Sequence, residues 1–356
     1  MVEVLGFDIG GANTKAAFLT VNNGKVQTAK VVSEYFPIWK DPEKLTSVLL
    51  ALKDKVGAGK LDALAVTMTA ELSDAYQTKR EGVWHILGCV KKAFPDVLIY
   101  VLNSNSELES LEAALAQPLG VASANWAATG WLVAKHVKNC VVLDVGSTTT
   151  SIIPIIDGKV AAKGKTDLEK LACSELIYTG SLRTNIAAIV RTIPIPIRGG
   201  LAVASVASEL FALSGDVHLV LGNISETDYT CETADGRGKT RLEAYARLAR
   251  VVCADIEMLS EREIVELAKI LCAMQVWQIF RGLAIVMSDV RPHAGGRVVV
   301  VVTGLGKDFL AKKAAEHSDA EIVDLATIVQ KEAVLATPAY AVALMAAEKL
   351  EGEHNR

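Results

Sequence analysis

Residues 7–14 read FDIGGANT, and residues 143–150 read LDVGSTTT. Each stretch ends an apolar run with the pattern Asp-x-Gly and leads into a second apolar run. The second runs end at Asn23-Gly24 and at Asp157-Gly158, turns of the kind that close β-hairpins. With 26 glycines in 356 residues, chance gives about one Asp-x-Gly, so two in the same pattern indicate an internal duplication.

Short β-branched runs alternate along the rest of the chain with longer stretches rich in Ala, Leu, Lys and Glu. This alternation predicts an α/β protein whose sheets are covered by helices. The expected strands are 2–8, 14–21, 63–69, 98–102, 139–144, 150–156, 218–221 and 297–303. The expected helices are 42–56, 81–93, 106–116, 125–136, 241–252, 261–287, 307–316 and 338–350.

Length and composition narrow the class of protein. A chain of 356 residues with 51% hydrophobic content predicts two or three domains, which we place at 1–136 and 137–337, with the helix at 338–350 packing back on the first. The net charge of −4 argues against nucleic-acid binding. The longest uninterrupted apolar run, 339–347, is far shorter than the roughly 20 residues of a membrane span. The N-terminal residues lack the pattern of a secretory signal, so we expect a cytoplasmic protein.

Cysteines and histidines are scattered and form neither a Cys-x-x-Cys pair nor a His-x-x-x-His pair, so a transition-metal site is not expected. The duplicated hairpins suggest a different chemistry. A glycine at a hairpin tip lets backbone N–H groups converge on a phosphate oxygen, and we expect φ > 0 and close approach at Gly10 and Gly146. The candidate phosphate-binding residues are Gly10, Gly11, Asn13, Thr14, Lys15, Gly146, Ser147, Thr148 and Thr149.

Two carboxylates complete this prediction. Asp8 and Asp144 end their strands, and we expect them to face each other across a cleft and to hold a hydrated Mg²⁺. The alternative is a pair of ordinary hairpins with residues that favour turns.

A third motif follows the buried run 298–302. Residues 303–307 read TGLGK, a glycine turn before an expected helix, where a ligand meets a helix N-terminus in doubly wound sheets. Gly304 and Gly306 are therefore candidate ligand-binding residues. Taken alone, the motif could be a plain strand-to-helix connection, and it lacks the third glycine of a dinucleotide fingerprint.

The three motifs, in this order, resemble the two phosphate loops and the adenosine loop of the sugar kinase, Hsp70 and actin superfamily. Within it the sequence is most similar to the hydantoinase A/oxoprolinase family, and there to its short members in tetrahydromethanopterin-linked one-carbon metabolism. The segments that carry the narrower resemblance are 66–74, 179–184, 221–223 and 233–237. The resemblance implies two actin-like (ribonuclease H-like) α/β domains whose Asp-x-Gly hairpins flank a central cleft.

The resemblance further implies a transferase of methanofuran biosynthesis. A (5-(aminomethyl)furan-3-yl)methyl diphosphate would lose diphosphate, and the phenol oxygen of γ-glutamyltyramine would attack the freed carbon. Mg²⁺ at Asp8 and Asp144, together with Lys15, would stabilise the charge on the departing diphosphate. The implied partners are these two small molecules, with neither nucleic acid nor membrane, and a homo-oligomer stays open.

A positioned base would help this reaction, because a phenol has a pKa near 10. Glu71, in a polar turn directly after a strand, is the candidate base, with Asp74 second; equally, Glu71 could begin a helix and complement its dipole. Arg183 is a candidate ligand for a carboxylate or the diphosphate, or else a salt-bridge residue. Asp235 and Arg237 lie in a polar loop, for which a solvated turn is favoured over a lid.

One departure limits the resemblance. Ser151 stands where the hydantoinase branch usually has Asp, and the chain lacks the further domain of the larger ring-opening enzymes, so ring opening is not expected. Two other function classes stay open: an ATP-dependent kinase-like or hydantoinase-like enzyme that uses the same loops, and a non-catalytic nucleotide-binding assembly protein.

Overall fold

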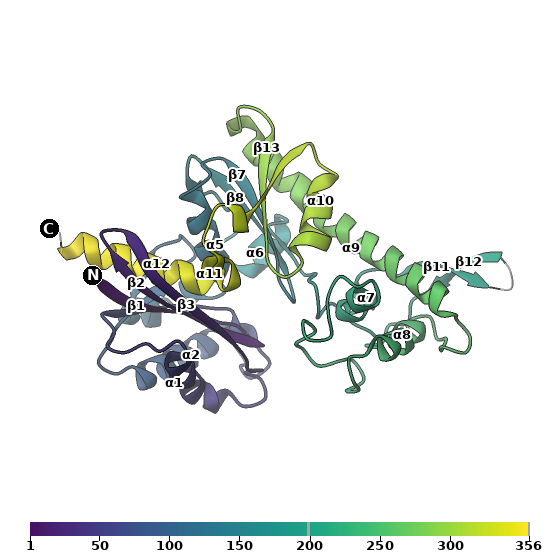
Figure 1. The fold of residues 1–356 in the computed structure, drawn as a ribbon, viewed down its shortest axis with the longest axis horizontal. Coiled ribbons are helices and arrows are strands. Elements are labelled where there is room, and N and C mark those ends of the chain that lie inside the picture. The colour runs from purple at the N-terminus through teal and green to yellow at the C-terminus, as the bar shows by residue number, and fades with distance from the viewer. Residues whose placement is uncertain (198–199, 355–356) are drawn as a thin grey trace. The chain divides into compact units, whose positions relative to one another are not determined.

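The computed structural model describes residues 1–197 and 200–354, and the chain divides into two compact units (Figure 1). Unit 1 comprises Met1–Asn139, Ile153–Ala172 and Leu325–Arg356, and unit 2 comprises Cys140–Ile152 and Cys173–Asp324. These bounds follow from packing within the chain. The domain boundaries expected at 136/137 and 337/338 stay a prediction.

Unit 1 is built on a six-stranded mixed sheet. Its strands are β1(Val2–Ile9), β2(Asn13–Asn22), β3(Lys25–Tyr35), β4(Ala63–Met68), β5(Leu98–Leu102) and β6(Leu108–Ser110), in the order β3-β2-β1-β4-β5-β6. Strands β1, β2 and β3 form an antiparallel meander, β4 and β5 run parallel to β1, and β6 is antiparallel to β5.

Helices cover both faces of this sheet. Those of unit 1 are α1(Leu45–Lys55), α2(Lys79–Ala93), α3(Leu111–Ala116), α4(Pro118–Val121), α5(Asn125–Ala134), α6(Asp167–Ala172), α11(Lys331–Leu335) and α12(Thr337–His354), with single turns η1(Pro42–Lys44), η2(Ala70–Leu72) and η6(Leu325–Thr327). Phe7 and Ile9 of β1 join the apolar core with α1 and α2. On the opposite face α12 packs so closely that a side chain at Gly6 would collide with Ala339 and Ala343.

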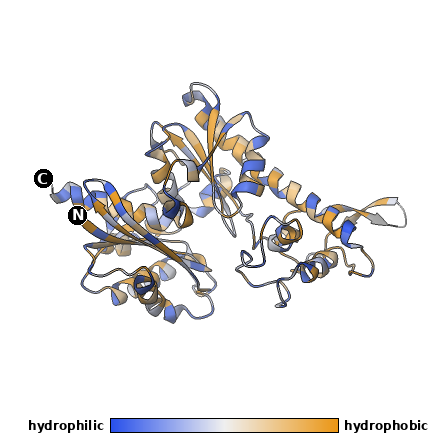
Figure 2. Cartoon of the chain, viewed as in Figure 1, coloured by the Kyte–Doolittle hydropathy of each residue, from blue (hydrophilic) through white to orange (hydrophobic). Residues whose placement is uncertain are grey.

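The second sheet has the order β10-β8-β7-β13-β14, with β9 paired to β8. Its strands are β7(Cys140–Val145), β8(Thr150–Ile156), β9(Lys159–Val160), β10(Leu176–Ile177), β13(Val298–Thr303) and β14(Ala320–Asp324), and the chain passes from unit 2 to unit 1 within β8. Strand β13 lies parallel between β7 and β14 and is hydrophobic along its length (Figure 2).

The rest of unit 2 is mainly helical. It contains α7(Ser214–Val220), α8(Arg241–Arg250), α9(Glu261–Val290), α10(Lys312–Glu316), the turns η3(Ile186–Ala188), η4(Arg291–His293) and the π-helical η5(Lys307–Ala311), and the hairpin β11(Thr192–Ile197)–β12(Gly200–Ser205). Helix α9 begins with a capping box, in which Ser260 Oγ accepts from the N–H of Glu263 and the Glu263 carboxylate accepts from the N–H of Ser260.

The two sheets share one plan. In each, an antiparallel hairpin (β1–β2 or β7–β8) is followed by two further strands parallel to its first strand, namely β4–β5 and β13–β14. The predicted turns are confirmed: Asn23 and Gly24 have φ of 51° and 72°, and Asp157 and Gly158 have the same pair of values. The α/β class is likewise confirmed.

Two predictions about local structure are wrong. Residues 218–221 form no strand, because His218 lies in helix α7, every residue of which is buried. A short buried helix and a short buried strand show the same apolar run, so periodicity could not separate them. The stretch 106–116 contains strand β6 before helix α3 begins. Strands β3, β9, β10, β11, β12 and β14 lie outside the expected strands. Of these, β3 and β14 are partly polar, and β11 contains proline.

Among the described residues, one helical stretch, Glu261–His293, is long and apolar enough by composition to cross a membrane, and 44% of its most apolar window is buried inside the structure. Core helices of soluble proteins pass the same test. The expectation of a protein without a membrane span therefore stays a prediction.

Candidate functional site

The loop of the first hairpin turns its amides outward. The N–H of Gly10 donates to the carbonyl of Asn13 at 3.0 Å, which closes the loop. The carbonyls of Gly11 and Ala12 accept from Ile38 and Phe36, at 3.0 and 2.9 Å. Because a trans peptide points its N–H opposite to its C=O, the N–H groups of Ala12 and Asn13 face away from the segment 36–38. Successive backbone N–H groups exposed in this way can bind a phosphate.

Gly10 is required because other backbone atoms approach it closely, and not because its backbone is left-handed. Neither Gly10 nor Gly146 adopts a left-handed φ, so that part of the prediction is wrong. A Cβ at Gly10 would lie 2.7 Å from the carbonyl oxygen of Asn13. Gly11 is different, since a Cβ there would meet nothing within 4 Å, which leaves open space on the loop surface.

Strand register gathers polar side chains beside this loop in unit 1. Asp8 pairs with Lys15 on β2 and with Thr67 on β4. Side chains paired across neighbouring strands share a face, so these three lie together on the face of Gly6. Thr14 does not join them: it pairs with Ile9, on the other face, and is fully buried.

The loop of the second hairpin repeats the first. The N–H of Gly146 donates to the carbonyl of Thr149 at 2.9 Å. The carbonyl of Gly146 accepts from Ser181, and that of Ser147 accepts from Leu182 and Arg183, at 2.9 to 3.0 Å. The N–H groups of Ser147 and Thr148 therefore point away from the turn at 179–184.

The third motif packs directly against the end of strand β7, where the second loop begins. Gly304 has φ of +88°, and a Cβ on it would collide with the carbonyl of Val145 and lie 2.5 Å from Asp144 Oδ1. A Cβ on Gly306 would lie 2.6 Å from Ser181 Oγ. Both glycines are thus required by close approach within unit 2. Arg183 also belongs here, with Nη1 at 3.5 Å from Thr148 Oγ1.

The side chains around both aspartates fit a hard cation. Asp144 pairs with Thr303 on β13, as Asp8 pairs with Thr67 on β4. The hydroxyls of Thr67 and Thr303 are buried and have no hydrogen-bond partner among the described residues. Carboxylate and hydroxyl oxygens are ligands that suit Mg²⁺, which usually adds waters and substrate phosphates. Among the described residues, no group of three or more His, Cys, Asp or Glu side chains gathers to hold a metal.

Glu71 lies in a buried polar cluster of unit 1. It sits in the single turn η2, and its side chain is fully covered. Its Oε1 accepts from Ser123 Oγ at 2.5 Å, and Ser123 Oγ is 2.7 Å from Asp167 Oδ2. Lys79 donates to Asp167 at 2.6 Å. Burial raises the pKa of Glu71, an effect that the hydrogen bond from Ser123 and the charge of Lys79 oppose.

The other predicted polar residues fall in different surroundings. Asp74 is exposed. Asp235 is held by Arg247 at 3.2 Å and by Arg250 at 3.0 Å, and Arg247 also pairs with the buried carboxylate of Asp216 at 2.8 Å. The loop of Asp235 is therefore anchored to helices α7 and α8, which goes beyond the solvated turn expected there. Arg237 is exposed.

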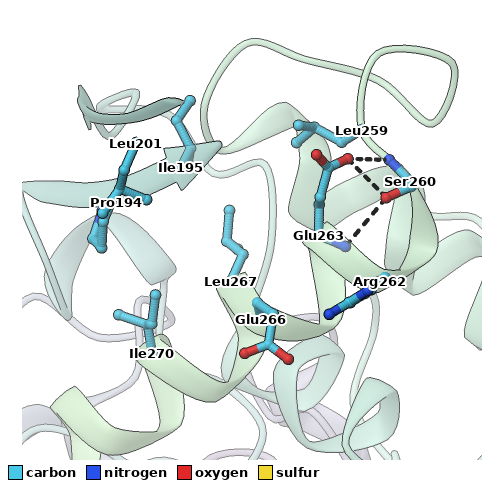
Figure 3. Close-up of a pocket in the computed structure, with 10 residues that line it drawn as sticks. All are labelled: Pro194, Ile195, Leu201, Leu259, Ser260, Arg262, Glu263, Glu266, Leu267 and Ile270. Atoms are coloured by element: carbon cyan, nitrogen blue, oxygen red, sulfur yellow. Dashed lines mark hydrogen bonds between the residues drawn. The ribbon is translucent and has the colours of Figure 1, made fainter. Parts of the chain in front are cut away.

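A cavity of about 640 Å³ lies elsewhere in unit 2, between the hairpin β11–β12 and the first turns of α9. Figure 3 shows its apolar wall, formed by Pro194, Ile195, Leu201, Leu267 and Ile270, and the capping bonds of Ser260 and Glu263 at its rim. None of the predicted site residues lines it. The candidate site therefore consists of the hairpin loops and their neighbours.

Several residues of these clusters were not expected from the sequence. Thr67 lies one residue before the end of β4 and Thr303 ends β13, and both strands are otherwise apolar in sequence. Ser123, Lys79 and Asp167 reach Glu71 from positions 52, 8 and 96 residues away, which no local pattern could signal. The turn 179–184 was singled out only through the resemblance, and its bonds to the second loop give it a structural reason.

Comparisons with known proteins find a relative that matches nearly the whole chain. A family model described as Hydantoinase/oxoprolinase matches residues 62–349. The chain is 38% identical to (4-{4-[2-(γ-L-glutamylamino)ethyl]phenoxymethyl}furan-2-yl)methanamine synthase of Methanocaldococcus jannaschii, over 98% of this chain and 99% of that protein. A protein of the same name from Methanococcus vannielii is 35% identical over 62% of this chain and 96% of its own length.

One solved structure of another protein has a similar fold. The nucleotide-free structure of an acetone carboxylase aligns with 96% of this chain and 70% of its own, with a TM-score of 0.53 and 9% identity. Together with the shared plan of the two sheets, this likeness confirms the actin-like α/β class that the motifs predict.

Proposed function

Because the chain belongs to the hydantoinase/oxoprolinase family and matches a curated synthase end to end, we propose that it catalyses the same ether-forming transfer in methanofuran biosynthesis. The end-to-end similarity to the Methanocaldococcus synthase is the observation that carries this proposal. The loops of the candidate site supply the amides and oxygen ligands that a diphosphate-bearing substrate would need.

The product named for the relatives contains the bond that we propose is made. It is an aryl ether in which a phenol oxygen joins the methylene on C4 of a furan that carries an aminomethyl group at C2. Cutting this ether gives γ-glutamyltyramine and a (5-(aminomethyl)furan-3-yl)methyl electrophile. In our proposal the electrophile is the diphosphate: the C–O bond breaks, its electron pair leaves with diphosphate, the phenol oxygen bonds to carbon, and the phenol proton passes to a base.

The residues of the loops divide this work. The amides and side chains at Gly10, Gly11, Asn13, Gly146, Ser147, Thr148 and Thr149, with Lys15 and Arg183, bind the diphosphate, and the burial of Thr14 leaves only its backbone for that role. Gly304 keeps room beside Asp144, and Gly306 keeps room beside Val145 and Ser181. Donors fixed before the reaction cost no reorganisation while charge develops on the leaving group.

Asp8 and Asp144 are the proposed Mg²⁺ ligands, with the hydroxyls of Thr67 and Thr303 beside them. The cation, when bound, would offset the negative charge of the leaving diphosphate. Both substrates are charged, so we place the enzyme in the cytoplasm. Whether it is a homo-oligomer is left open by this proposal.

Glu71 remains the proposed base. A carboxylate whose pKa is raised by burial takes a proton at higher pH than an exposed one, which suits proton abstraction near neutrality. Its Oε2 is buried and has no partner among the described residues, so this oxygen is the one offered to the phenol.

The test is a reconstitution without ATP. The purified protein is incubated with the furan diphosphate, γ-glutamyltyramine and Mg²⁺, and ether and diphosphate are quantified by mass spectrometry and a phosphate assay after pyrophosphatase. We expect one diphosphate for each ether formed, and strong slowing when Mg²⁺ is chelated. Strict dependence on ATP, with ADP as a stoichiometric product, would refute the transfer and favour the kinase-like alternative.

A further inference from the structure

A hydrogen-bonded network of buried side chains lies next to the turn that holds the second loop. His218 on α7 and Gln275 on α9 are both fully buried, and His218 Nε2 is 3.0 Å from Gln275 Oε1. Gln275 Nε2 donates to Thr179 Oγ1 at 2.8 Å and to the carbonyl of Gly180 at 3.0 Å. The network thus connects α7, through α9, to the start of the turn 179–184.

The hydrogen bonds show which atom is the donor in each contact of this network. Gln275 uses its amide nitrogen on Thr179 and Gly180, so its oxygen must accept, and His218 Nε2 must carry the hydrogen. His218 Nδ1 is then an acceptor, and it lies 3.1 Å from the amide nitrogen of Asn223, which donates to it. Burial lowers the pKa of His218 to about 4, so the ring stays neutral near pH 7 and keeps this tautomer.

The turn 179–184 is held by both helices of the network, by α9 through Gln275 and by α7 through Ser214. The carbonyl of Thr184 accepts from the N–H of Ser214, the first residue of α7, at 2.8 Å. Gly180 fits against the second loop with so little space that a Cβ would lie 2.6 Å from the N atom of Thr148. A shift of Gly180 toward the loop would therefore press on the backbone of Ser147 and Thr148, whose N–H groups point away from the turn.

His218 also contacts the third motif. Its ring packs against Phe309 of η5 with centroids 4.4 Å apart. Phe309 follows Gly306 by three residues, so the buried ring of His218 packs directly on the helix that follows Gly306 and reaches the turn 179–184 through Gln275.

We propose that Gln275 and His218 are positioning residues, which hold the loop 146–149 in its phosphate-binding form through the turn 179–184. This inference rests on the proposed role of that loop in binding diphosphate. The two side chains touch no substrate; they act by fixing the carbonyls of the turn, and thereby the direction of the loop amides.

The test uses Gln275→Met, which keeps the length and volume of the side chain but removes its donors and acceptor. Gln278→Met is the matched control. Gln278 lies one turn along the same helix, and its amide donates to the carbonyl of Ile189, which is not part of this network. Affinity for inorganic diphosphate and for ADP, each with Mg²⁺, is measured by calorimetry on the full-length protein. Hydrogen exchange of each variant is followed by mass spectrometry.

We expect Gln275→Met to weaken binding by about tenfold, because it leaves buried polar groups unpaired and the turn less fixed. Exchange should rise in 146–149 and 179–184, while Gln278→Met leaves both affinity and those peptides unchanged. A merely structural role would lower stability and raise exchange throughout the unit, with normal affinity in the folded protein. A folded Gln275→Met variant with wild-type affinity overturns the proposal.

A second variant covers failure of Gln275→Met to fold. Asn223 is exposed, and Asn223→Ala removes the donor to His218 Nδ1 and leaves that buried ring nitrogen without this bond. We expect a few-fold loss of affinity, and an unchanged affinity counts against the proposal. If the wild-type protein binds ADP but not diphosphate, the transfer fails while the positioning role is tested on ADP. If it binds neither, the loop is not a phosphate site and the positioning role falls with it.

Discussion

Gly304 offers the sharpest single test of the second loop, through the substitution Gly304→Ala. The residue has φ of +88°, a conformation that costs an L-residue about 1–2 kcal/mol. The new methyl group would collide with the carbonyl of Val145 and lie 2.5 Å from Asp144 Oδ1, whereas ordinary carbon contacts are about 3.5 Å or more. The strand end that carries Asp144 must therefore move by about 1 Å.

We expect two consequences of that movement. A displacement of about 1 Å at a reacting centre can cost about 100-fold in rate, so kcat/KM for ether formation should fall by that order. Strain of about 2 kcal/mol should lower Tm by about 4–8 °C in a domain of this size.

Steady-state kinetics and differential scanning calorimetry measure both effects. Gly296→Ala is the control, because a Cβ there meets nothing within 4 Å and Gly296 has no left-handed φ. Wild-type kcat/KM in Gly304→Ala would refute the argument that Asp144 needs the space beside this glycine.

Three further predictions concern other parts of the chain. Asp144→Asn should lower kcat by about 100-fold and change KM much less, because charge on the leaving group grows toward the transition state. Steady-state assays test this, and equal changes in kcat and KM would contradict the proposed role of Asp144. Glu71 has a folded pKa above its ordinary 4.5, so its contribution to stability is present below that pH and is lost as pH rises through the folded pKa. The gain in Tm from Glu71→Gln should therefore increase from pH 4 to pH 8 in thermal scans, and a constant difference would show that Glu71 does not titrate there. Arg247→Leu leaves the carboxylate of Asp216 buried and unpaired, which should destabilise the protein by about 3–5 kcal/mol in urea denaturation, and a cost below 1 kcal/mol would argue against a buried ion pair.

Local chemistry determined much of the fold in advance. The Asn-Gly and Asp-Gly pairs at 23–24 and 157–158 adopt positive φ because these residues tolerate it, and each closes the hairpin expected from the flanking apolar runs. The Asp-x-Gly motifs end strands β1 and β7 in corresponding places of two sheets with the same plan. Such features depend on a few adjacent residues, so sequence patterns suffice to predict them.

Tertiary structure decided what surrounds the motifs. Glu71 accepts a hydrogen bond from Ser123 beside Asp167, and Gln275 joins His218 to the turn 179–184; these partners are separated by dozens of residues. His218 itself falls in the expected strand 218–221, because three apolar residues after a histidine do not reveal whether the preceding residues form a helix with them. Polar contacts between distant elements depend on how those elements pack, and packing is a property of the folded chain that no short segment of sequence contains.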